Sequence, residues 1–335
     1  MTLHLNRRHF ATSALLTPVA FTSLTANAQT PAASPVTGMD GTVGLMSTLE
    51  EWTAAAGEGT PVGEMGTMFE FVSPTDGVTP VTVGFTEETA SFMEYTFGEE
   101  TIGQEDAQAI VAGSIPQEAM PGETFLLTSH EDTSSPFTAM VYSLPSFPNT
   151  TVLSVMALGA LEAEEAQVVS ISISLSSLEP SGYTATGDPG GIGLTHDQIG
   201  EIYGAPADAV GEFEIYPGTG PDGLNLSIRY TSGGEAAKAI HANSPEDAPV
   251  TTTRENAMAF VGSSVPADAV VGMSYRLPST EAGPISLEAV LWTSPELQEQ
   301  LRYKGSVLSM VYTIEGESAP EVQRIDLAIN NDLPV

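Results

Sequence analysis

Residues 107–120 read AQAIVAGSIPQEAM, and residues 257–270 read AMAFVGSSVPADAV. The two stretches align without a gap, and Pro116 matches Pro266 at a separation of 150 residues. Apolar residues recur in both at i, i+3 and i+4, the spacing of an amphipathic helix. The proline ends that helix, because it has no N–H to donate and disfavours helical geometry in the preceding residue. Self-similarity at a fixed spacing predicts a duplicated structural unit.

A second helix is predicted upstream of each copy. Thr48–Glu51 and Thr195–Gln198 both have the spacing of a capping box, in which the first side chain caps the helix and the fourth reaches back. Gly57 and Gly204 end these helices, since glycine tolerates the left-handed backbone that commonly follows a last turn. The two predicted helices therefore have the same length.

Extended segments with alternating residues surround these helices. Residues 169–176 alternate Val, Ile or Leu with Ser, and residues 324–329 alternate Ile or Leu with Arg, Asp and Ala. Strict alternation is typical of an antiparallel sheet with one face in solvent. We therefore predict an α+β fold of two tandem repeats, each an antiparallel sheet with two helices packed on one face.

The repeats and the Pro-, Gly- and Ser-rich stretches between them set the expected boundaries. These are a signal peptide at 1–28, a flexible linker at 29–43, repeat one at 44–176, a linker at 177–192 and repeat two at 193–335.

The N-terminus has the three parts of a secretory signal peptide. NRRHF at 6–10 supplies the charge, an apolar, Thr-rich run spans 11–24, and Ala26-Asn27-Ala28 forms the cleavage site. Arg7-Arg8 resembles the core of a twin-arginine signal, and an ordinary secretory signal with two chance arginines is the alternative. Both predict an exported protein, extracellular or in the cell envelope, and periplasmic if an outer membrane is present.

The chain is strongly acidic, with 43 Asp and Glu against nine Lys and Arg and a formal net charge of −34. Removal of Arg7 and Arg8 with the signal takes this charge to −36, and no Lys or Arg occurs between Arg8 and Arg229. Such a surface repels phosphate backbones and anionic headgroups, which argues against binding to nucleic acids or membrane surfaces. A basic protein or divalent cations are the partners that the charge favours. No stretch after the signal is long and apolar enough to span a membrane.

Cysteine is absent, which excludes disulfides, a thiol nucleophile and cysteine zinc ligands. His130, His196 and His241 have no metal-ligand spacing, and we expect each to be a surface or capping residue. Residues 218–223, GTGPDG, lack the lysine and helix of a phosphate loop, so a hairpin turn is predicted there. We predict no catalytic residue and no cofactor.

One acidic group is a candidate metal site. Glu162, Glu164 and Glu165 lie in the loop before the last strand of repeat one, and calcium binds such oxygen-rich loops. The group lacks the alternating spacing and the glycine of a dedicated calcium loop. A solvated run of charge is therefore the preferred interpretation.

The segment GLTHDQIGEIYGAP at 193–206 resembles the opening of small exported modules, namely outer-membrane assembly lipoproteins of the SmpA/OmlA type and the β-lactamase inhibitor protein. The resemblance implies a non-catalytic module that binds another protein through a sheet face. It transfers no binding residue, and two features differ: strands separate the two helices here, and the lipoprotein cysteine is missing.

Taken together, these features predict an exported, non-catalytic binding module for a protein partner. An exported hydrolase that uses paired carboxylates for acid–base chemistry and a calcium-binding envelope protein are the alternatives. The lack of cations in the first repeat also predicts that acid will not destabilise the protein. Protonation relieves repulsion between carboxylates, so stability should hold or rise as the pH falls towards about 4.

Overall fold

The structure, a computed structural model, describes residues 43–62, 66–73, 79–97, 101–127, 137–158, 167–177, 182–210, 212–231, 236–245, 249–278, 285–301, 305–315 and 320–330. Residues up to 177 are called the first half, and residues from 182 onwards the second half. The predicted signal peptide at 1–28 and the linker at 29–43, apart from its last residue, lie outside the described residues.

The helices in this part of the chain are α1 (Leu49–Ala56), α2 (Gln104–Ser114), α3 (His196–Tyr203), α4 (Arg254–Ser264) and α5 (Pro295–Leu301), with a short 3-10 turn η1 (Pro221–Gly223). None of them is long and apolar enough to cross a lipid bilayer. The strands of the first half are β1 (Thr60–Val62), β2 (Met68–Val72), β3 (Pro80–Thr86), β4 (Thr89–Thr96), β5 (Ile102–Gly103), β6 (Met120–Leu127), β7 (Phe137–Ser143), β8 (Thr151–Leu158) and β9 (Gln167–Ser177). Those of the second half are β10 (Asp208–Val210), β11 (Phe213–Tyr216), β12 (Asn225–Tyr230), β13 (Ala237–Asn243), β14 (Thr252–Thr253), β15 (Val270–Pro278), β16 (Ile285–Thr293), β17 (Ser306–Glu315) and β18 (Pro320–Ile329).

The helix signals in the sequence are confirmed. Thr48 and Thr195 form complete capping boxes with Glu51 and Gln198, in which each partner satisfies a backbone N–H of the other. Helices α2 and α4 both span eleven residues and both end before a proline. Their alanine and valine pairs, Ala107 with Val111 and Ala257 with Val261, are buried as the periodicity predicts.

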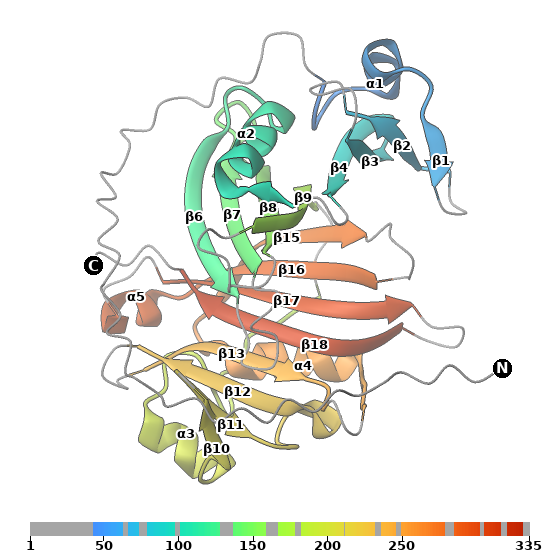
Figure 1. The fold of residues 1–335 in the computed structure, drawn as a ribbon. Coiled ribbons are helices and arrows are strands. Elements are labelled where there is room, and N and C mark those ends of the chain that lie inside the picture. Colours follow the sequence, from blue (N-terminus) through green and yellow to red (C-terminus); the bar gives the residue numbers. More distant parts are fainter. Residues whose placement is uncertain are drawn as a thin grey trace, which may run out of the picture. The chain divides into compact units, whose positions relative to one another are not determined.

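The strands are antiparallel and follow the same order in each half. The first half runs β1–β2–β3–β4–β9–β8–β7–β6, and the second runs β10–β11–β12–β13–β18–β17–β16–β15. Strand β15 also pairs with β9 through Ser274–Ser177 and Tyr275–Ser176, which joins the halves. Figure 1 shows β15 beside β9, where the orange and green strands meet.

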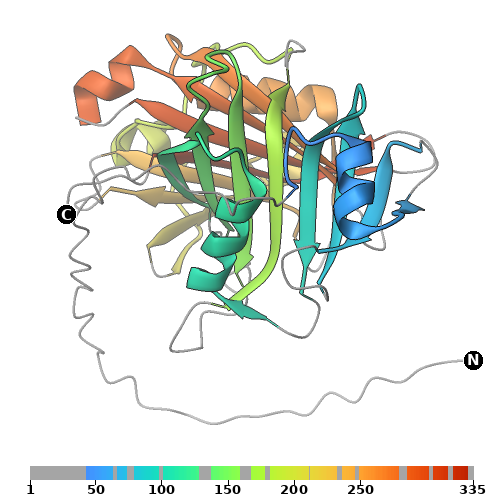
Figure 2. The same ribbon diagram turned by 90° about the horizontal axis from the view of Figure 1, so that it is seen from above.

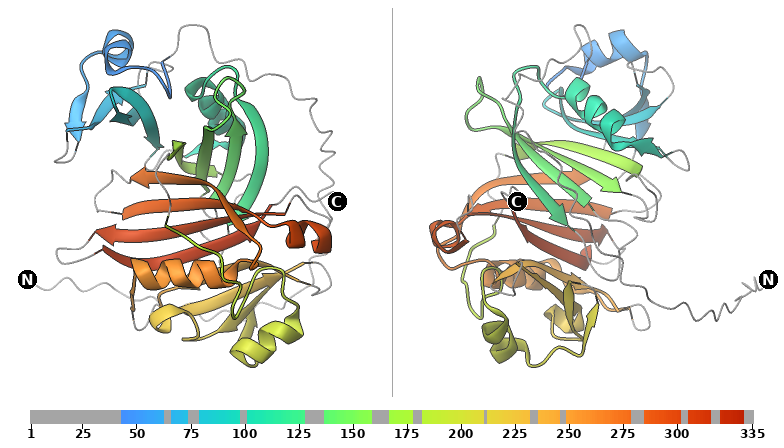
Figure 3. Two further views of the ribbon diagram at one scale, coloured as in Figure 1. Left: turned by 180° about the vertical axis from the view of Figure 1, so that it is seen from behind. Right: turned by 60° about the vertical axis from the view of Figure 1, so that its left-hand side comes forward.

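The predicted fold class is wrong. Instead of two tandem α+β repeats, each with two helices on one sheet face, the described residues form one connected 18-stranded antiparallel sheet in which strands dominate. In the second half, α4 lies against β17 and β18, and the additional helix α5 follows β16 (Figure 3). Figure 2 shows α1 and α2 against the strands of the first half.

The physical reason is that each half buries both faces of its strands. One face packs on the helices of its own half, forming two separate clusters around Trp52 and Trp292. The opposite faces form a third cluster shared by both halves. It includes Phe92, Phe125, Leu153 and Val155 from the first half and Tyr275, Leu308, Met310 and Ala328 from the second.

The serine side of β9 shows the same burial. It was expected to face solvent, but Ser174 and Ser176 are buried. The Ser174 hydroxyl donates to the carbonyl of Arg276 in the other half, at 3.1 Å. A further hydrogen bond of 2.7 Å joins the hydroxyls of Thr151 and Tyr275 across the same boundary. Alternation identified the strand correctly, but Ser174 is satisfied by the other half, and Ser176 accepts from the Thr151 N–H at 3.0 Å, instead of facing water.

Candidate functional site

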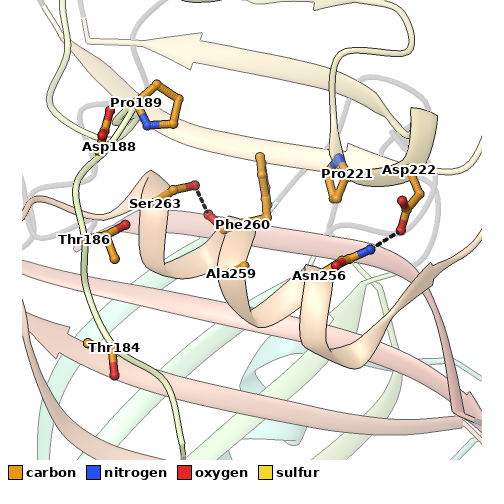
Figure 4. A pocket seen from close by; sticks show the side chains of 10 residues that line it. All are labelled: Thr184, Thr186, Asp188, Pro189, Pro221, Asp222, Asn256, Ala259, Phe260 and Ser263. Atoms are coloured by element: carbon orange, nitrogen blue, oxygen red, sulfur yellow. Dashed lines mark hydrogen bonds between the residues drawn. The ribbon is translucent and has the colours of Figure 1, made fainter.

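An open groove runs along the outer side of α4 and has a volume of about 500 Å³. Three segments far apart in the sequence form it. Its lining residues are Thr184, Thr186, Asp188, Pro189, Pro221, Asp222, Asn256, Ala259, Phe260 and Ser263. Figure 4 shows Phe260 rising from the helix between Asp188–Pro189 on one side and Pro221–Asp222 on the other.

The first wall is residues 182–192, here called the strap. Its described residues belong to the predicted linker, but they are fixed along α4 by backbone hydrogen bonds. Thr186 N–H donates to Gly262 O at 2.8 Å, and Ile192 N–H donates to Ser264 O at 2.8 Å. Gly262 is required at this approach, because a Cβ there would overlap the carbonyl oxygen of Thr184.

The start of the strap is also fixed by side chains. Tyr183 is buried, its ring meets Trp292 edge-on, and its hydroxyl donates to Glu288 at 3.2 Å. Glu288 in turn accepts two hydrogen bonds of 2.9 Å from Arg254, the first residue of α4. Burial and the neighbouring Glu288 carboxylate raise the pKa of Tyr183, so the hydroxyl stays protonated and continues to donate. This wall of the groove is therefore built before any ligand arrives.

The second wall is the turn η1, which joins β11 to β12 and confirms the predicted hairpin turn. Asp222 has a φ of 53°, a left-handed backbone that aspartate adopts more readily than most residues. Its Oδ2 accepts from the Thr252 hydroxyl at 2.6 Å and from the Asn256 amide at 2.7 Å. These hydrogen bonds lower the pKa of Asp222, so it is ionised at neutral pH.

The floor of the groove is the outer face of α4. The periodicity predicts Phe260 on the buried face of the helix, and the structure places it half-buried, packed against the core of the second half while also lining the groove. Its equivalent in α2 is Ile110. Ala259 is exposed beside it, as is Ala109 at the equivalent position of α2. Helices α2 and α4 thus have equivalent outer surfaces, and the described groove lies on the surface of α4.

The chemistry of the groove is mixed. The hydroxyls of Thr184 and Thr186 offer hydrogen bonds, and Phe260 offers an aromatic face. The Ser263 hydroxyl donates to Phe260 O at 2.9 Å and can still accept a hydrogen bond from a ligand. Asp188 and Asp222 supply negative charge, and no Lys, Arg or His is among the ten lining residues. The arrangement suits recognition of a polar, positively charged ligand.

A second feature is a buried charged cluster around His241, on the side of β13 that faces the first half. His241 and Asp326 are both fully buried. The Asp326 carboxylate accepts from His241 Nδ1–H at 2.8 Å and from Arg324 Nε–H at 2.8 Å. The Arg324 guanidinium lies 5.1 Å from the ring centroid of Phe137 in the first half.

Opposing effects set the charges in this cluster. Burial lowers the pKa of His241, and the nearby Asp326 opposes this only in part, so the imidazole is neutral. Burial raises the pKa of Asp326, but Arg324 and His241 more than offset it, so the pKa of this carboxyl lies below its ordinary value. With Nδ1–H bound to Asp326, His241 Nε2 is left without a hydrogen-bond partner among the described residues. The cluster connects the halves, but no lining residue of the groove belongs to it.

The depressed pKa of His241 makes stability depend on pH. Below about pH 6.5 the histidine is protonated in the unfolded chain but stays neutral in the folded chain. The free energy of unfolding therefore falls by up to about 1.4 kcal/mol per pH unit, until the pH reaches the pKa of His241 in the folded protein. Asp326 does not contribute in this window, because the effect of its lowered pKa is lost only below about pH 4. This loss of stability in acid opposes the gain in stability that is expected when protonation relieves the repulsion between carboxylates.

The variant His241→Asn isolates the effect, because its amide keeps a donor for Asp326 and does not titrate. We expect denaturant unfolding at pH 7 and pH 5 to show the unmodified protein losing stability relative to the variant as the pH falls. Parallel pH profiles for the two proteins would exclude a buried neutral histidine.

The sequence candidates have different outcomes. Glu162, Glu164, Glu165 and His130 lie outside the described residues, and the residues that are described contain no group of three or more acidic or histidine side chains that could hold a metal. His196 is half-exposed at the start of α3 and bonds Glu214 through Nε2 at 2.8 Å, as a surface residue would. His241 is the exception, because it is buried within a strand instead of lying at the surface. The groove residues were not predicted, since only tertiary contacts bring the strap, η1 and α4 together.

No model of a known protein family matches the chain, and no curated protein matches it. Among solved structures, the chain is similar to the H959F variant of the PpsC dehydratase domain from Mycobacterium tuberculosis, at 10% identity over 81% of this chain and 99% of that chain, with a TM-score of 0.15. It is also similar to the dehydratase domain of a mycocerosic acid synthase-like polyketide synthase, at 9% identity over 75% and 95% of the chains, with a TM-score of 0.14. Scores this low carry no argument about fold or activity.

Proposed function

We propose that the protein is an exported, non-catalytic binding module that holds an extended segment of a partner protein in the α4 groove. The observation that carries this is the groove itself, with a volume of about 500 Å³, within the range of pockets that bind small molecules or a few side chains. Hydroxyl and amide groups along it match the donors and acceptors of an extended backbone. The signal-like N-terminus supports export.

The electrostatics of the groove favour binding over hydrolysis. A hydrolase with paired carboxylates needs one of them protonated, which requires a raised pKa. Hydrogen bonds from Thr252 and Asn256 lower the pKa of Asp222. Asp188 and Asp222 also lie on opposite walls of the groove, instead of converging on one point (Figure 4). The same pair is suited to attracting a cation from two sides.

Selection of peptides on the protein tests this function. Random heptapeptides displayed on phage should yield peptides that bind the chain from residue 29 onwards. Ala259→Trp fills the groove and should weaken the selected peptides by at least about tenfold, or 1.4 kcal/mol. Ala109→Trp places the same side chain at the equivalent, exposed position of α2 and should leave binding within about twofold. Equal loss in both variants, or no effect of Ala259→Trp, would contradict the proposal.

A further inference from the structure

The charge of the groove is fixed but not neutralised. Asp222 accepts hydrogen bonds from the Thr252 hydroxyl and the Asn256 amide, which are neutral donors. They orient the carboxylate and keep it ionised, yet they leave its full negative charge in place. Asp188 adds a second, exposed carboxylate on the opposite wall.

The cations of the described residues are engaged elsewhere. Arg254 and Arg276 contact Glu288, Lys238 contacts Glu212, and Arg324 contacts Asp326. None of these residues, nor Arg229, lines the groove. Among the described residues, therefore, none brings a positive charge to the lining of the groove, and a cationic ligand can supply one.

The aromatic side chain on the floor of the groove favours one kind of cationic ligand. Phe260 stands between the two aspartates, half-buried and within the groove (Figure 4). An aromatic face attracts a cation, and guanidinium stacks on it better than ammonium because it is planar and less strongly hydrated. Guanidinium also carries five N–H donors in a planar fork that matches a carboxylate, so it can bond the carboxylate of either wall.

We propose, resting on the function proposed above, that the groove recognises an arginine side chain in an extended basic segment of the partner. The guanidinium stacks on Phe260 and is attracted by the carboxylates of Asp188 and Asp222 on the two walls, while the segment's backbone bonds Thr184, Thr186 and Ser263. The strong negative charge of the whole protein steers such a segment towards it.

The test uses a fluorescent peptide, Gly-Ser-Gly-Arg-Gly-Ser-Gly, and the same peptide with citrulline in place of arginine. Citrulline keeps the shape and loses the charge. Binding is measured by fluorescence anisotropy at low and moderate salt. We expect the arginine peptide to bind about tenfold more tightly than the citrulline peptide, since a cation–π contact and the attraction of two exposed carboxylates act together.

Three variants locate the effect. Asp188→Asn and Asp222→Asn should each weaken the arginine peptide about three- to fivefold, and asparagine tolerates the left-handed backbone at 222. Asp106→Asn removes the same charge from the α2 surface and should change binding by less than about twofold. Thermal melting checks that every variant is folded.

The outcomes separate the two proposals. Arginine and citrulline peptides that bind equally, with both weakened by Ala259→Trp, would overturn the arginine preference and leave the groove as the binding site. Equal losses for Asp106→Asn and Asp188→Asn would mean unspecific attraction to an acidic protein and would also overturn the preference. Peptide binding that Ala259→Trp does not affect would overturn the groove function itself.

Discussion

Phe125→Ala is expected to lower the free energy of unfolding by about 3–5 kcal/mol, and to do so for the whole chain at once. Phe125 is fully buried in the cluster shared by both halves. Its loss leaves a cavity between the two sheet faces, and neither half has another surface to bury that face against. A change in the first half should therefore destabilise the second half equally.

The two tryptophans make this measurable. Trp52 lies in the core of the first half and Trp292 in the core of the second, and both are fully buried. In proteins that keep only one tryptophan, urea unfolding followed by fluorescence reports each half separately. The two transitions should coincide, and Phe125→Ala should shift them together. Phe147→Ala, at a residue that is 45% exposed, should stay within about 0.5 kcal/mol. A shift of the Trp52 transition alone would show that the halves fold independently.

Asp326→Ala is expected to cost a similar amount, about 3–5 kcal/mol at pH 7. The carboxylate is fully buried and accepts hydrogen bonds from His241 and Arg324. Its removal leaves the Arg324 charge without this anion in a low-dielectric environment. Removing one partner of a buried ion pair destabilises a protein strongly, because the remaining charge stays buried.

An ion pair with an exposed carboxylate is the control. Lys238 and Glu212 are 3.6 Å apart, and the Glu212 side chain is 72% exposed. Glu212→Ala should cost no more than about 1 kcal/mol, because solvent screens the pair. Denaturant unfolding at pH 7 compares the two variants. Equal costs would mean that the buried cluster contributes no more than a surface contact.

Local structure was predictable from the sequence because its signals are local. The capping boxes at Thr48 and Thr195, the proline-ended helices and the alternation in β9 each depend on a few neighbouring residues, and each is found. The fold class failed for a reason that alternation does not reveal. Serines such as Ser174 look solvent-facing in sequence, whereas the other half covers them.

The site was less accessible to sequence reasoning. His241 has apolar neighbours on a strand, which was a signal for burial, but its partner Asp326 lies 85 residues away. Phe260 fits the apolar spacing of α4, which does not indicate a binding site. The groove around it exists only because the strap and η1 lie on either side of α4 in the folded protein. The one sequence hint was that, apart from Arg7 and Arg8 in the predicted signal peptide, the basic residues all lie in the second half, so the halves must differ in their electrostatics.

If the α4 groove binds a ligand as proposed, the strap also sets the kinetics of that binding. Because Tyr183, Thr186 and Ile192 fix its backbone along α4, a ligand does not have to order this wall when it binds. Association is then governed by diffusion and long-range attraction, and should slow as salt is added. Differences between related ligands should appear mainly in their residence times, since each ligand meets the same preorganised surface.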